Sequence, residues 1–227
     1  MKKNRTINRR QFIKKAVTTA AGVTFPYFVP SSVLGGTGSV AASNRITLGC
    51  IGTGNQGVQD MRGFLQNDDV RVVAVCDVNT ASYGYRSAKQ YLGREPGRKI
   101  VNDYYAAKTR SGRYKGCDAY NDFREIINRD DIDAVLIVTP DHWHAVMTIM
   151  AAKAGKDIYC EKPLSLTVAG GRAMVKAVKK YGVILQTGTH HRSTQQVRFA
   201  CELVRNGRIG RLKRIIVNLD PHPVRFP

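Results

Sequence analysis

The chain has 227 residues, of which 43% are hydrophobic, and its formal net charge is +19 at pH 7. This length suits one good-sized domain, or one domain and part of another, and the composition is that of a globular protein rather than a disordered or fibrous one. No basic helix interleaved with aromatic residues accompanies the charge, so nucleic-acid binding is not expected. An anionic substrate or cofactor, or an acidic partner segment, is the favoured interpretation.

The N-terminal segment has the pattern of an export signal. Residues 1–15 are basic, and residues 16–44 carry no charged side chain. The apolar part is broken by Pro26 and Pro30, which makes it too short to span a membrane. Arg9 and Arg10, with an aromatic residue two positions later, resemble the bacterial twin-arginine signal. We therefore predict that residues 1–42 are a twin-arginine signal read by that export machinery, and that the protein is exported to the periplasm or cell envelope. A disordered basic arm, or an arm that packs on a partner subunit, remains the alternative.

A glycine-rich turn is the most informative motif. Gly52-Thr53-Gly54-Asn55-Gln56-Gly57 follows an apolar run and precedes a helix-like stretch, as in a dinucleotide-binding strand–turn–helix. Gly52 permits the tight turn, Gly54 lets the backbone approach a pyrophosphate, and Gly57 lets the helix pack close to the strand. The helix N-terminus offers free N–H groups to phosphates. The alternative is an ordinary glycine-rich turn.

A second strand supports the dinucleotide interpretation. Residues 70–76 form an apolar run that ends in Asp77, which lies 25 residues after Gly52. A carboxylate at this position accepts hydrogen bonds from the adenosine ribose hydroxyls and repels a 2′-phosphate. We therefore predict NAD as the cofactor and NADP as less favoured, although Arg86 is close enough in sequence to reach a 2′-phosphate.

The remaining pattern alternates strands with helices, which predicts a doubly wound parallel α/β sheet of the Rossmann type in the strand order 3-2-1-4-5-6. A polar insertion, with a helix at 82–92 and a breaker at 93–97, separates the second and third strands. We expect the dinucleotide-binding domain to span residues 43–190. The predicted strands are 46–51, 70–76, 118–120, 134–138, 157–160 and 183–186. The other predicted helices are 58–65, 123–129, 143–154, 168–181 and 195–206. Asp122 and Thr167 are predicted to cap the helices that follow them, and Gly182 to end the second of these. The buried face of the 168–181 helix is predicted to carry Met174, Val175, Val178 and Tyr181.

Residues 191–227 are expected to begin a second, α+β domain for substrate binding and oligomerisation. A predicted strand at 212–219 would have no sheet to join, so the second domain would be incomplete. The five cysteines are odd in number and contain no C-x-x-C pair, which argues against a zinc ribbon or a disulfide framework. Cys50, Cys76 and Cys160 are predicted to be small core residues.

Lys162 is the candidate catalytic residue. It lies between Glu161 and Pro163, where the fifth strand ends, and a Lys at that edge can hold or polarise a substrate hydroxyl or carbonyl. A surface Lys in a turn is the alternative. The carboxyl edge of the sheet should also carry Thr139, Pro140 and His144, which we predict to contact the cofactor together with Glu161.

The histidines leave several interpretations open. His142 and His144 can act as acid–base groups, stack near the cofactor, or simply pack and cap a helix, and Trp143 can pack or stack on a sugar. A metal site with His190 and His191 lacks a convincing ligand spacing, so no metal is predicted.

Taken together, the glycine motif, Thr139-Pro140-Asp141-His142-Trp143-His144-Ala145 and Glu161-Lys162-Pro163 resemble the glucose–fructose oxidoreductase and inositol dehydrogenase family over residues 45–219. The resemblance implies NAD(P)-dependent oxidation or reduction of a sugar or polyol, with Lys162 in the substrate site and a homo-oligomeric full-length protein. Family members carry a catalytic Asp and His further along their second domain, in a segment this sequence does not contain. The chain is therefore expected to be an inactive N-terminal fragment of an enzyme exported folded with its cofactor. Two other functions stay open: an NAD-dependent glycosidase that uses transient oxidation, and a non-catalytic cofactor- or sugar-binding protein.

Overall fold

The computed structural model describes residues 40–84 and 87–218, which divide between Arg45 and Ile46 into two units. The described part of the first unit contains a 3-10 turn, η1 (Ala42–Asn44), and the Arg45 guanidinium donates to the Val40 carbonyl at 3.1 and 2.9 Å. Nearly all of the predicted export signal, residues 1–42, lies outside the described residues, as does Arg86. Among the described residues, no helix has the length and apolar character that crossing a membrane requires.

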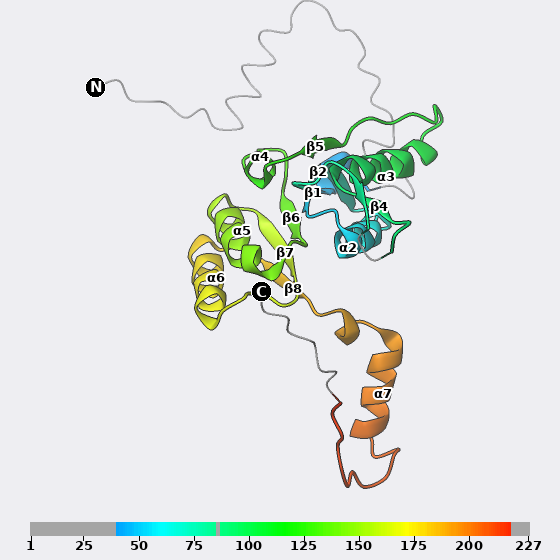
Figure 1. Cartoon of the computed structure of the whole chain (residues 1–227), viewed down its shortest axis with the longest axis vertical. Coiled ribbons are helices and arrows are strands. Elements are labelled where there is room, and N and C mark those ends of the chain that lie inside the picture. Colours follow the sequence, from blue (N-terminus) through cyan, green and yellow to red (C-terminus); the bar gives the residue numbers. More distant parts are fainter. Residues whose placement is uncertain (1–39, 85–86, 219–227) are drawn as a thin grey trace, which may run out of the picture. The chain divides into compact units, whose positions relative to one another are not determined.

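The second unit is built on a six-stranded parallel sheet, which confirms the predicted α/β class and strand order (Figure 1). Because the strands are buried between helices, they read as nearly continuous apolar runs in the sequence. In sheet order the strands are β5 (Asp118–Tyr120), β2 (Val70–Cys76), β1 (Ile46–Ile51), β6 (Ala134–Ile137), β7 (Asp157–Glu161) and β8 (Leu185–Gly188).

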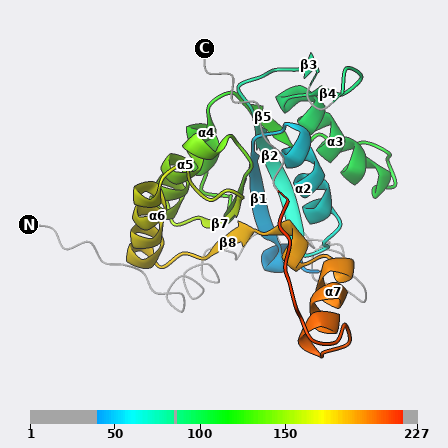
Figure 2. The ribbon, with the colours of Figure 1, turned by 60° about the horizontal axis from the view of Figure 1, so that its bottom comes forward.

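Helices cover both faces of this sheet (Figure 2). One face packs against α2 (Asn55–Leu65) and α3 (Arg94–Ala107). The other face packs against α4 (Phe123–Ile127), α5 (Asp141–Lys153) and α6 (Val168–Tyr181). Two separate apolar cores result, as expected for right-handed crossovers on a parallel sheet.

The helix boundaries follow local signals. Asp122 accepts a hydrogen bond from the backbone N–H of Arg124 at 2.9 Å and caps α4, and Thr167 accepts one from Gly170 at 3.1 Å and caps α6. Gly182 ends α6 in the left-handed conformation, with φ of 69°. These caps agree with the sequence prediction.

The predicted buried face of α6 was partly wrong. Met174 is buried as expected, but its partner in the core is Ala177, while Val175 and Tyr181 are 40% and 38% exposed. Each residue advances about 100° around the helix, so Val175 points away from the stripe that Met174 defines.

The insertion after β2 also differs from the prediction. β3 (Ser82–Tyr83) pairs in antiparallel fashion with β4 (Tyr91–Leu92), and the described residues between 82 and 92 contain no helix. The predicted breaker at 93–97 instead begins the 14-residue helix α3, after Gly93 at φ 137°. Pro96 is tolerated because the first-turn N–H groups of a helix have no intrahelical partner.

The C-terminal described residues contain the 3-10 turn η2 (His190–Arg192) and α7 (Gln195–Arg205). The strand predicted at 212–219 is not formed over residues 212–218, and Leu219 lies outside the described residues. Within the described residues no strand pairs with this segment, so its backbone groups lack the ladder that a strand requires.

Candidate functional site: a dinucleotide-binding edge of the sheet

The glycine turn joins β1 to α2 with very little space. Gly52 has φ of 91°, and a Cβ there would clash with the Val138 carbonyl of the neighbouring strand end. A Cβ on Gly57 would clash with the carbonyl of Gly52, 2.9 Å from its carbon. Gly54 is the N-cap residue, and its side of the turn is left open for a ligand. The turn therefore allows a pyrophosphate to come close to its backbone.

Asp77 is tied directly to this turn. Its Oδ2 accepts hydrogen bonds from the Thr53 backbone N–H at 2.8 Å and from the Thr53 hydroxyl at 3.3 Å, and its Oδ1 accepts one from the Asn79 N–H at 2.9 Å. A carboxylate has about four lone-pair positions, so a position remains for a ribose hydroxyl. Thr53 is fully buried, and Gly97 of α3 packs so close that a Cβ would lie 2.9 Å from its methyl group. The carboxylate is thus held in one orientation.

A cavity of about 580 Å³ opens beside Asp77. It brings together five of the predicted cofactor residues and adds mostly apolar neighbours from α4, α5 and the segment at the end of β2. The predicted members are Gly52, Gly54, Asp77, Thr139 and Pro140, and the added neighbours include Val78, Phe123, Arg124 and Trp143. Such a mostly apolar cavity with a few fixed polar groups is typical of small-molecule sites.

Trp143 has a defined place at this cavity. It is 40% exposed and its ring meets the edge of Phe123 at a centroid distance of 6.3 Å. It lines the same cavity as Asp77, so its exposed face is available to the nucleotide end of a ligand.

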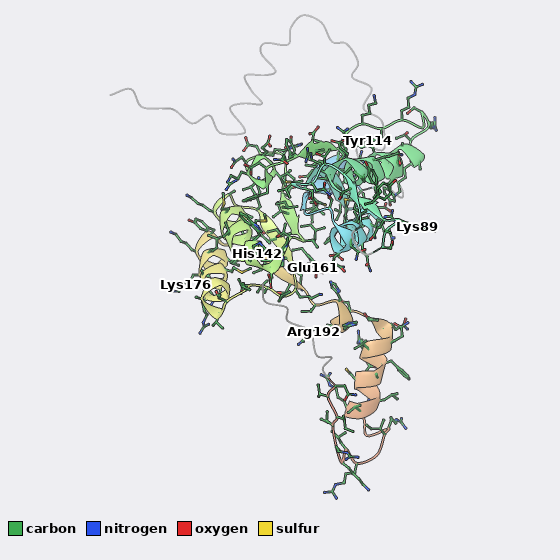
Figure 3. All side chains as sticks on the ribbon, viewed as in Figure 1. Lys89, Tyr114, His142, Glu161, Lys176 and Arg192 are labelled. Atoms are coloured by element: carbon green, nitrogen blue, oxygen red, sulfur yellow. The ribbon has the colours of Figure 1, made fainter. Side chains whose placement is uncertain are left out.

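His144 is engaged by the protein itself. Its side chain is 1% exposed, with Nε2 2.7 Å from the Thr139 carbonyl and Nδ1 2.8 Å from the Pro163 carbonyl. The ring therefore bridges the loops that follow β6 and β7, and its effect on a cofactor would be exerted through Thr139. The neighbouring His142 is exposed and lies near Asp141 at 3.8 Å (Figure 3).

Glu161 and Lys162 end β7 with opposite exposure. Glu161 is 2% exposed, and its Oε2 accepts the Lys162 backbone N–H at 3.1 Å. The Lys162 side chain is exposed at the carboxyl edge of the sheet, and the Lys162–Pro163 peptide bond is cis. In the parallel register Glu161 lies opposite Gly188, so the ends of β7 and β8 meet here.

The remaining predicted turn residues lie away from the cavity wall. Asn55 accepts a hydrogen bond from Gln90 at 2.7 Å, and Gln56 donates to the Asp60 carboxylate at 2.7 Å. Asp60 is a residue that the sequence prediction missed. Burial is the largest cause that raises its pKa, and the charge of Glu161 adds to it. No spacing pattern links Asp60 to residues so distant in the chain.

Arg94 was also missed, because it fell in the predicted breaker. Its guanidinium donates to the carbonyls of Asp77 and Val78, both at 3.2 Å, and thereby fixes the backbone that carries the carboxylate.

Residues 46–189 match the family model described as "Oxidoreductase family, NAD-binding Rossmann fold", GFO/IDH/MocA. The chain belongs to this family. The match covers the six strands and every predicted site residue, so the cofactor domain is an NAD-binding Rossmann domain, as predicted.

Among curated relatives, the chain is 32% identical to myo-inositol 2-dehydrogenase of Thermotoga maritima over 177 residues, which is 78% of this chain and 46% of that protein. It is 31% identical to α-N-acetylgalactosaminidase of Shewanella oneidensis over 174 residues, covering 71% of this chain and 35% of the relative. The chain thus spans less than half the length of these relatives.

A solved structure shows the same fold. Scyllo-inositol dehydrogenase from Lactobacillus casei, with bound NAD(H) and scyllo-inositol, superposes with a TM-score of 0.56 at 22% identity, covering 73% of this chain and 42% of that one.

Proposed function

We propose that the whole protein is an NAD-dependent oxidoreductase acting on a sugar or polyol, and that residues 46–189 are its cofactor-binding part. The observation that carries the proposal is the Asp77 carboxylate, fixed by Thr53 beside a cavity that also contains the glycine turn and Thr139. The names of the relatives, inositol dehydrogenase among them, support a polyhydroxylated substrate.

The residues of the chain fit a dinucleotide. The turn at Gly52 and Gly57 has no room for a side chain, and the N-terminus of α2 presents its first-turn N–H groups, which have no intrahelical acceptor, to the pyrophosphate. Asp77 binds a ribose hydroxyl, and the apolar wall around Trp143 and Phe123 receives the adenine ring. Bound NAD supplies the hydride acceptor of the reaction.

Lys162 is proposed to bind the reacting oxygen of the substrate. Its exposed ammonium group stands at the carboxyl edge of the sheet, where ligands bind in open α/β folds. The buried Glu161 accepts its backbone N–H and so holds the turn from which the side chain projects. A cation at this position stabilises negative charge that develops on the oxygen as hydride leaves the carbon.

Cofactor choice is tested by titrating NAD and NADP into the purified chain. We expect tighter binding of NAD, because Asp77 repels a 2′-phosphate, and a smaller difference between the two cofactors in Asp77→Ala. Asp69→Ala, an exposed acid outside the cavity, is the control. Equal or tighter NADP binding by the parent chain would refute the preference.

The role of Lys162 is tested in the whole protein with a panel of sugars and polyols. Lys162→Ala should lower kcat by about 10²- to 10⁴-fold, the usual range for a lost acid–base or polarising group, with NAD affinity retained. Lys176→Ala, which removes an exposed lysine on α6, should leave kcat unchanged (Figure 3). A Lys162→Ala enzyme with parental kcat would exclude this role.

An NAD-dependent glycosidase is the second candidate, because the chain is 31% identical to an α-N-acetylgalactosaminidase over 174 residues. Glycoside cleavage without net formation of NADH would favour it. Formation of NADH with a free sugar or polyol favours the dehydrogenase.

We also propose export of the folded protein by the twin-arginine route. The supporting pattern is Arg9-Arg10 followed by an uncharged stretch and small residues at 39–42. Because this route carries folded proteins, NAD would be bound in the cytoplasm before export. Changing both arginines to Lys keeps the charge and should abolish secretion. Undiminished secretion would contradict the proposal.

A further inference from the structure

Three potential metal ligands converge where β7, α2 and η2 meet. Asp60 comes from α2, Glu161 from the end of β7, and His190 from η2. One ligand atom from each residue lies within 4.8 Å of the other two. Figure 3 places Glu161 at the strand end from which this group is built. We call these three residues the carboxylate–imidazole cluster.

The group is held in place by buried contacts. Glu161 is 2% exposed, and its Oε1 lies 2.7 Å from His190 Nε2. A Cβ on Gly188 would lie 2.8 Å from the Glu161 carboxyl carbon, so a glycine at 188 leaves the space that this carboxylate occupies. The cluster is therefore assembled by the fold, with one ligand on each of three elements.

One oxygen of the cluster accepts no hydrogen bond from any donor in the described part of the chain. Asp60 Oδ1 accepts one from Gln56 at 2.7 Å, whereas Asp60 Oδ2 is shielded from solvent and has no such donor. Shielding a carboxylate oxygen from water without a hydrogen-bond donor is unfavourable, and a bound cation would offset this. Two carboxylates and one imidazole thus face each other with an oxygen still available to a cation.

We propose that the carboxylate–imidazole cluster binds a divalent transition-metal ion, Zn²⁺ or Mn²⁺, through Asp60 Oδ2, Glu161 Oε1 and His190 Nε2. An imidazole nitrogen with two carboxylate oxygens suits such ions better than Mg²⁺ or Ca²⁺, which prefer all-oxygen sites. Ligands of a tetrahedral Zn²⁺ at about 2.0–2.2 Å lie about 3.3–3.6 Å apart, so the Glu161–His190 contact needs to open by less than about 1 Å.

The surroundings supply the outer contacts that a metal site needs. Gln56 donates to the second oxygen of Asp60, and the Lys162 backbone N–H donates to the second oxygen of Glu161. Such outer donors orient the ligands and usually change metal affinity 10- to 100-fold when removed. Three protein ligands leave at least one coordination position open, and this inference stands independently of the proposed dehydrogenase activity.

The test uses the 227-residue chain without an affinity tag, stripped with a chelator. Zn²⁺ is titrated by calorimetry and Co²⁺ by visible absorption. We expect one equivalent of either ion. Asp60→Asn and His190→Gln should each weaken binding at least tenfold, and Gln56→Leu about tenfold. His191→Gln removes the exposed neighbour in the same turn and should bind like the parent.

Several outcomes would overturn the inference: binding of much less than one equivalent, parental affinity in both Asp60→Asn and His190→Gln, or equal loss in His191→Gln. A sulfur-to-cobalt band in the parent spectrum would place the ion on the exposed Cys201 instead and would also overturn it. If Asp60→Asn does not fold, the visible spectrum of the Co²⁺-loaded parent chain still tests the inference. It must show bands of nitrogen and oxygen ligation at one equivalent of Co²⁺.

Discussion

Replacing Gly57 by Ala tests whether the closeness of β1 and α2 matters for both stability and cofactor binding. The added methyl group would collide with the Gly52 carbonyl, 2.9 Å from its carbon, and would lie 3.5 Å from the Val138 side chain. Backbone cannot rotate away as a flexible side chain does, so the upper end of the overpacking range, about 3 kcal/mol, applies. The better helix propensity of Ala returns up to about 1 kcal/mol. The expected net loss in free energy of unfolding is therefore about 2 kcal/mol, or about 4–8 °C in Tm.

The matched control is Gly63→Ala, on the same helix, where a Cβ meets nothing within 4 Å. This variant should gain up to about 1 kcal/mol from helix propensity, so the two substitutions are expected to have opposite signs. Moving α2 also withdraws an N–H group from the pyrophosphate, and losing one hydrogen bond to a charged group weakens NAD binding about 10- to 100-fold. Thermal unfolding and NAD titration measure both effects. A Gly57→Ala chain with parental Tm and parental NAD affinity would refute the argument.

Three further predictions concern other parts of the molecule. Lys156 is 8% exposed and donates to two backbone carbonyls at 2.6 and 2.8 Å, so Lys156→Met should lower the free energy of unfolding by about 1–3 kcal/mol. The control Lys153→Met, at an exposed position, should change it little. Equal effects of the two substitutions in urea unfolding would contradict this. Thr167→Ala should lower the free energy of unfolding by about 1 kcal/mol because it removes the α6 cap, whereas Thr167→Ser should retain the cap. Similar Tm values for the two variants would argue against the cap. At pH 8 only Cys201 should react rapidly with a thiol reagent in the native chain, whereas all five cysteines should react in urea. Rapid modification of a second thiol in the native chain would be inconsistent with the buried positions of the other four. Burial raises the pKa of the other four thiols, to about 11 for Cys160 and about 12 for Cys76 and Cys117, with Cys50 also raised.

Local signals predicted the sheet and the nucleotide end of the site. The glycine turn, the apolar run before Asp77 and the caps at Asp122 and Thr167 each report on a few neighbouring residues. Since parallel strands with right-handed crossovers leave few topologies, the order of the strands followed from their number and spacing.

The start of α3 shows where local signals fail. Pro96 and Gly97 indicate a break in sequence, yet both lie in the first turn of a helix. Gly97 is accommodated there because it packs against Thr53, a contact between elements far apart in the chain. The contact of Asp60 with Glu161 and His190 has the same origin, since three separate elements must fold before these residues meet.

The imidazole of His144 links the two loops that any redesign of this protein would want to alter separately. One ring nitrogen lies against the Thr139 carbonyl on the cofactor side, and the other against the carbonyl of Pro163, next to Lys162. A graft that replaces the loop at residue 139 on the cofactor side would therefore also release the segment that presents the lysine. A graft should therefore replace both loops together with His144. If only one loop were exchanged, a buried ring nitrogen and a carbonyl would be left without hydrogen-bonding partners.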